Sequence, residues 1–61
     1  MQPDKYGRSV ISTPDGNGNI VYSVFNTDGS PALTVEFPYT TDLDHVYYVI
    51  NSMAPSDQVG Q

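Results

Sequence analysis

Apolar and polar residues alternate with a spacing of two over the stretch 32–37 (Ala-Leu-Thr-Val-Glu-Phe). Leu33, Val35 and Phe37 fall on one side of this pattern, and Thr34 and Glu36 on the other. Successive side chains of a β-strand point to opposite faces, so this alternation predicts a strand with one buried face.

Two earlier stretches, 8–13 and 19–26, are rich in β-branched and aromatic residues, and we predict that they are also strands. The segments 14–18 (Pro-Asp-Gly-Asn-Gly) and 27–31 (Thr-Asp-Gly-Ser-Pro) separate the three stretches. Gly and Asn accept the positive φ angles that tight turns need. Strands joined by such short turns are antiparallel neighbours, so the sequence predicts a three-stranded antiparallel β-meander.

The period changes after Pro38, and apolar residues then recur at spacings of three, four and seven, as on one stripe of an α-helix. This stripe comprises Leu43, Val46, Tyr47, Ile50, Met53 and Ala54, with Asp44, Tyr48 and Asn51 on the opposite side. We expect Thr41 or Asp42 to cap the helix start, and Pro55 to end the helix. The β-branched and aromatic run 46–50 leaves a strand as the alternative for 42–54, but cap and period favour the helix.

The sequence therefore predicts one small α+β domain over residues 1–61, with a C-terminal helix packed on one face of the sheet. We expect an ordered core over about 8–54, a flexible N-terminal arm at 1–7 and a flexible tail at 55–61. A chain of this size buries only about 60% of its unfolded surface. It has no cysteine for a disulfide, so a homodimer is one way to stabilise it.

The second strand is apolar on both faces: Ile20, Tyr22 and Val24 point one way, and Val21 and Phe25 the other. One helix covers only one face of a sheet, so we predict an exposed hydrophobic patch on the other face, suited to a dimer or a partner. Tyr22 and Phe25 are candidate contacts, of which only one can lie on the free face. The alternative is that Tyr6, Tyr39 or the terminal arms cover this patch.

Charge narrows the choice of partner. The chain has seven acidic residues and only two basic ones, Lys5 and Arg8, which gives a net charge of −5. Nucleic-acid phosphates would be repelled, so we expect no direct nucleic-acid binding. The longest apolar run, 46–50, is too short to cross a bilayer, so we expect no membrane segment. A basic protein surface is the partner that this charge favours.

No constellation of residues points to catalysis, a cofactor or a metal. His45 is the only histidine, and the adjacent Asp44 would point about 100° away from it on a helix. The segment 15–19 (Asp-Gly-Asn-Gly-Asn) resembles the opening of a calcium loop, but Ile20 stands where that pattern needs glycine. A hairpin turn is the favoured interpretation. We therefore expect a protein that is not an enzyme.

The acidic residues themselves suggest a binding site. In a meander, Asp15, Asp42 and Asp44 would share one end of the sheet, where carboxylates can imitate DNA phosphates. The candidate contacts are the acidic residues Asp15, Glu36, Asp42 and Asp44, and the exposed aromatic residues Tyr39 and Tyr48. The plainer alternative is that turns, helix caps and solubility account for the acids.

We thus expect a small acidic inhibitor of the kind that bacteriophages and mobile elements encode, acting in the host-cell cytoplasm. It would block a basic, nucleic-acid-binding surface of a CRISPR effector, a nuclease, a repair enzyme or RNA polymerase. The alternative is a structural or assembly subunit, such as a small virion component, that associates through the apolar sheet face. Added salt would weaken the first kind of complex and leave the second unchanged.

Overall fold

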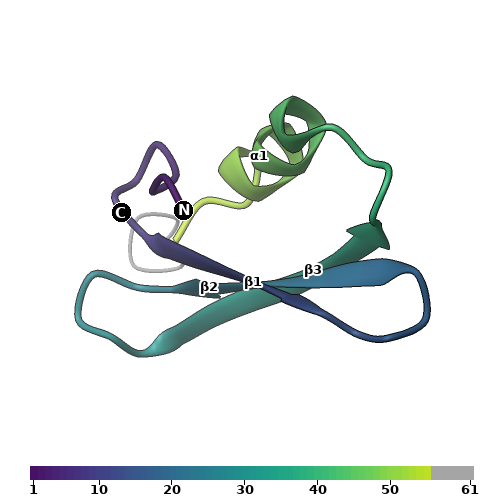
Figure 1. The fold of residues 1–61 in the computed structure, drawn as a ribbon. Helices are drawn as coiled ribbons and strands as arrows, with labels where there is room; N and C mark the ends of the chain where they lie inside the picture. The colour runs from purple at the N-terminus through teal and green to yellow at the C-terminus, as the bar shows by residue number, and fades with distance from the viewer. Residues whose placement is uncertain (56–61) are drawn as a thin grey trace.

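A computed structural model describes residues 1–55. It contains three strands and one helix in the predicted order, which are β1 (Ser9–Pro14), β2 (Asn19–Phe25), β3 (Pro31–Pro38) and α1 (Leu43–Asn51). The strands form one antiparallel sheet in the order β1-β2-β3, and α1 lies over one face of it (Figure 1). The α+β fold predicted from the sequence is therefore confirmed.

In each of the two tight turns, an aspartate carboxylate accepts hydrogen bonds from the backbone N–H groups of residues that follow it. Asp15 Oδ1 accepts the N–H of Asn17 at 2.7 Å and that of Asn19 at 3.1 Å. Gly16 and Gly18 have φ angles of +84° and +87°, which a residue with a Cβ rarely adopts. The segment that resembles a calcium loop is thus a hairpin turn whose carboxylate oxygen already bonds backbone donors.

The core lies between the sheet and α1. Its buried side chains are at most 4% exposed, and they are Val10, Tyr22, Val24, Val46 and Ile50. Phe37 is half-buried at the border of this cluster, where its ring meets those of Tyr22 and His45 edge to face at centroid distances of 6.3 and 5.8 Å. So small a core leaves much of the stability to polar contacts.

The helix departs from its predicted details at both ends. Asp42 occupies the N-cap position, but its side chain makes no capping bond, and its carbonyl oxygen instead accepts the N–H groups of His45 and Val46 at 3.1 Å. The predicted apolar stripe holds in the middle of α1, whereas Leu43 is 53% exposed and Met53 42% exposed. Met53 follows the end of α1, so the helical period no longer directs it inward.

The N-terminal segment folds back on the side of the sheet that carries α1 (Figure 1). Asp4 and Arg8 form an ion pair there with Nε–Oδ2 at 2.6 Å, and their side chains are 0% and 2% exposed. The other Asp4 oxygen accepts the backbone N–H of Tyr6 at 3.1 Å and of Arg8 at 2.7 Å. No pattern in the sequence indicated these contacts. That segment 1–7 is flexible stays a prediction. The predicted flexible tail, apart from Pro55, lies outside the described residues.

Arg8 also reaches the end of α1. Its Nη2 donates to the carbonyl oxygens of Ile50 at 3.1 Å and Met53 at 2.7 Å. The last carbonyls of a helix lack partners within the helix and carry partial negative charge, so a cation there satisfies both needs. Within residues 1–55, every buried side-chain nitrogen or oxygen has a hydrogen-bond partner.

Replacing Arg8 should therefore cost most of the stability. Arg8→Met leaves the Asp4 carboxylate buried without its cation, and breaking a buried pair costs about 3–5 kcal/mol. A domain this small has a total stability of the same order. We expect Arg8→Met to be largely unfolded, as measured by urea titration with circular dichroism.

Two variants test the cause. Lys5→Met removes an exposed cation from the same segment and should change stability by less than about 0.5 kcal/mol. The double variant Asp4→Leu/Arg8→Met should be more stable than Arg8→Met, because it leaves no charge buried alone. Equal stability of Arg8→Met and Lys5→Met would contradict the assigned role.

Candidate protein-binding site

The buried ion pair changes the balance of charge at the surface. It takes the Arg8 and Asp4 side chains out of contact with solvent. A further acid, Asp57, lies outside the described residues. The remaining acids are accessible to solvent and comprise Asp15, Asp28, Glu36, Asp42 and Asp44. Within residues 1–55, Lys5 is the one lysine or arginine side chain left at the surface. The surface is thus more one-sidedly acidic than the composition alone indicates.

Four of these acids lie at one end of the molecule. The N–H of Tyr39 donates to Gly18 O at 2.9 Å, which ties the β1–β2 turn to the chain that leaves β3. Asn19 joins two of the carboxylates, since its Nδ2 donates to Glu36 Oε2 and its backbone N–H to Asp15 Oδ1, each at 3.1 Å.

Asp42 and Asp44 follow where this chain enters α1 (Figure 1). We call Asp15, Glu36, Asp42 and Asp44 the acidic end. Asp28 lies in the β2–β3 turn at the opposite end of the sheet.

Hydrogen bonds keep two of the turn carboxylates ionised. The backbone N–H of Asn17, with further hydrogen bonds from Asn19, holds the pKa of Asp15 below its ordinary value. The hydroxyl and then the N–H of Ser30 lower the pKa of Asp28 in the same way. Both groups therefore carry full negative charge at neutral pH.

The predicted aromatic contact residues differ in how exposed they are. Tyr39 is 69% exposed beside the acidic end, and Tyr48 is 72% exposed on α1. Tyr22, by contrast, is 3% exposed in the core and is not available to a partner, because it lies on the face that α1 covers. Of the two residues predicted for opposite faces, Phe25 is therefore the one on the free face, where it is half-buried.

The free face of the sheet is less apolar than predicted. Its rows, read across the sheet, are Ser9 with Phe25 and Pro31, Ile11 with Ser23 and Thr34, and Thr13 with Val21 and Glu36. Every row thus contains at least one polar residue beside its apolar ones, and Ile11 is the large apolar side chain of this face that is more than half exposed, at 53%. The N-terminal segment lies on the other side of the sheet (Figure 1), so it does not cover this face.

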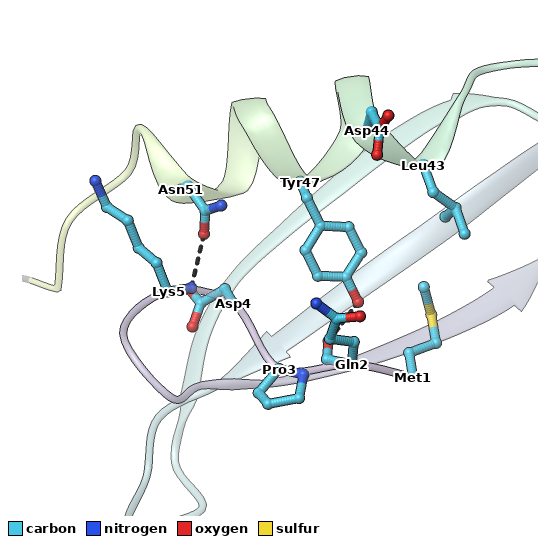
Figure 2. A pocket seen from close by; sticks show the side chains of 9 residues that line it. All are labelled: Met1, Gln2, Pro3, Asp4, Lys5, Leu43, Asp44, Tyr47 and Asn51. Carbon is cyan, nitrogen blue, oxygen red and sulfur yellow. Dashed lines mark hydrogen bonds between the residues drawn. The ribbon is translucent and has the colours of Figure 1, made fainter.

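A groove of about 610 Å³ runs between the N-terminal segment and α1, lined by residues of both. In Figure 2 the Tyr47 ring points from the helix toward Gln2, and its hydroxyl donates to Gln2 O. The N–H of Lys5 donates to Asn51 Oδ1 at 2.9 Å. The prediction that Asn51 lies opposite the apolar stripe is therefore wrong, because Asn51 faces the N-terminal segment beside Tyr47. Burial and then the charge of Asp4 raise the pKa of Tyr47. This groove could not be predicted from the sequence, because it exists only when the N-terminal segment folds back.

Within residues 1–55, no three His, Cys, Asp or Glu side chains lie together as a metal site requires. None of the helices in this part of the chain has the length and apolarity needed to cross a membrane. The chain matches no protein-family model, no curated protein and no solved structure.

The lowered pKa of Asp28 makes the stability of its turn depend on pH. The folded pKa lies below the ordinary value of 3.8, so the contribution is present above the unfolded pKa and is lost as the pH falls through the folded one. We expect Asp28→Ala to lower the melting temperature at neutral pH, with a difference from wild type that narrows as the pH falls toward about 3.

Asp28→Asn is the matched control, because its amide oxygen can accept the same bonds without charge. It should lower the melting temperature less than Asp28→Ala does. A difference between wild type and Asp28→Ala that stays constant with pH would contradict the assigned bonds.

Proposed function

We propose that this protein is a small, non-catalytic protein-binding module that inhibits a nucleic-acid-handling protein by occupying its basic surface with the acidic end. The observation that carries the proposal is the separation of charge. Four accessible carboxylates share one end of the fold, while the basic residues Lys5 and Arg8 sit beside the C-terminal end of α1. No Lys or Arg within residues 1–55 interrupts the acidic end.

The geometry of the acidic end suits a basic groove. Asp15 and Glu36 are joined through Asn19, so their carboxylates are held in place before a partner arrives. Preorganised charge costs less to bind than charge on a free side chain. Clustered charge of one sign also speeds the encounter with an oppositely charged surface.

Tyr39 supplies the apolar part of the contact. It is 69% exposed and lies in the connection that also carries Asp42. Tyrosine gives a large contact area at a low cost in side-chain entropy. The partners with suitable basic grooves are CRISPR effectors, nucleases, repair enzymes and RNA polymerase, and the module is of the type that bacteriophages and mobile elements encode.

The alternative, an assembly subunit held by the free sheet face, has one supporting observation, the exposed Ile11. The polar neighbours of each apolar residue on that face disfavour it, because a dry interface would bury their hydroxyl groups and the Glu36 carboxylate. A complex whose affinity does not change with salt concentration would favour this alternative.

Two variants of equal net charge test the acidic end. Asp42→Asn/Asp44→Asn removes two charges from it, and Ser9→Lys/Thr27→Lys adds two positive charges at exposed positions near the other end. Both change the net charge from −5 to −3. Wild type and both variants would be immobilised and exposed to a bacterial lysate, followed by elution in salt steps and an affinity measurement with the purified target.

We expect a basic nucleic-acid-binding protein that elutes from wild type at moderate salt and loses its own nucleic acid when bound. The acidic-end variant should bind it about tenfold more weakly, equivalent to about 1.4 kcal/mol, while the control stays within about threefold of wild type. Equal weakening by both variants would reject a localised site. A bait that captures no basic protein at any salt step would contradict the proposed function.

A further inference from the structure

The two edges of the sheet differ in how well they are covered. At the β1 edge, the backbone N–H and C=O of Arg8 bond Asp4 of the N-terminal segment, and Pro14 at the other end of β1 has no N–H to donate. Along β3, the alternate residues Ala32, Thr34 and Glu36 are all exposed. An exposed edge strand presents unpaired N–H and C=O groups, which can pair with another strand. β3 is therefore the more open of the two edges.

The register identifies the outward-facing backbone groups. In an antiparallel pair, every second residue of a strand exchanges backbone hydrogen bonds with its neighbour. Tyr39 bonds Gly18 on the β2 side, so Phe37, Val35 and Leu33 are the residues of β3 that exchange hydrogen bonds with β2. Thr34 and Glu36 then direct their N–H and C=O groups outward. Among residues 1–55, no backbone group outside the sheet bonds to either of them. Ala32 is left out because the register shifts beside it.

We propose that a second copy of this chain pairs antiparallel with β3 and joins the two three-stranded sheets into one. In the register centred on Val35, Thr34 lies opposite the partner's Glu36, and each of them donates and accepts one backbone bond. Every outward group of the two residues is then used. The Pro31 and Pro38 residues that bound β3 fall outside the paired stretch.

The side chains of β3 are complementary to themselves in this register. On the side of α1, Val35 meets the partner's Val35 and Leu33 meets the partner's Phe37, so half-buried apolar groups cover one another. On the free face, the Glu36 carboxylate meets the partner's Thr34 hydroxyl and not a second carboxylate. Cross-strand pairs of these kinds stabilise a sheet, whereas like charges directly opposite destabilise it.

The distribution of charge also selects the antiparallel arrangement. The acidic end lies at the C-terminal end of β3, so antiparallel pairing sends the two acidic ends to opposite ends of the dimer. Parallel pairing would place them side by side in a molecule with a net charge of −5 per chain. A two-fold axis through Val35 thus leaves Asp15, Asp42 and Asp44 of both acidic ends free, while Glu36 takes part in the strand pairing.

Cysteine cross-linking tests this register, because the chain has no cysteine of its own. Val35→Cys places a thiol on the axis in a non-hydrogen-bonded pair, with Cα atoms about 4.5 Å apart and within disulfide reach. Leu33→Cys is the matched control on the same face, where the two thiols would be about 13 Å apart. We expect a disulfide-linked dimer on mild oxidation of Val35→Cys and little from Leu33→Cys.

A second variant separates pairing from folding. Thr34→Pro removes an N–H that the monomer does not use, at an edge position where proline is tolerated. It should keep the circular dichroism spectrum of wild type and sediment as a monomer, whereas wild type dimerises as its concentration rises. Wild type that remains monomeric at about 1 mM, far above the Kd of a weak specific dimer, would overturn the proposal. Equal cross-linking of both cysteine variants would do the same.

Discussion

The buried ion pair between Asp4 and Arg8 joins three parts of the chain that the small core does not connect alone. Asp4, in the N-terminal segment, bonds the backbone and side chain of Arg8 at the start of β1. The Arg8 side chain also donates to the carbonyl oxygens at the end of α1. The cost of burying two charges is offset because no buried nitrogen or oxygen of either side chain lacks a hydrogen-bond partner. The groove beside Tyr47 follows from the same contact, since one wall of it is the folded-back segment.

The ion pair also shapes the surface that a partner would meet. It removes the arginine from solvent and leaves Lys5 as the exposed base among the described residues, close to the end of α1. The accessible acids concentrate at the far end of the sheet, where the β1–β2 turn meets the chain leaving β3. Stability and surface charge are therefore linked, because the same residues that hold the fold together set the charge pattern on which the proposed function rests.

The sequence predicted the parts of the fold that local chemistry decides. Alternation in β3, Asp-Gly turns and the helical period after Pro38 each act within a few residues. It did not predict the Asp4–Arg8 pair, because charged residues near a terminus ordinarily lie in solvent and no periodic pattern marks their burial. Nor could it decide between Tyr22 and Phe25 as the exposed aromatic residue, since that depends on which face α1 covers. The acids of the proposed binding site lie at the surface, in a turn, on β3 and at the helix start, where the sequence places them, but the joining of Asp15 and Glu36 through Asn19 required the strand register.

The most direct test of this account is the exchange of the Arg8 Nε–H with solvent, followed by NMR together with the ¹⁵N relaxation of residues 1–8. A buried donor held at 2.6 Å from Asp4 Oδ2 should exchange far more slowly than a free guanidinium, and residues 4–8 should be as rigid as the sheet. Rapid exchange of the Arg8 Nε–H, with relaxation of residues 4–8 typical of a free terminus, would contradict the account, because the fold would then lack the contact on which its groove and its surface charge depend.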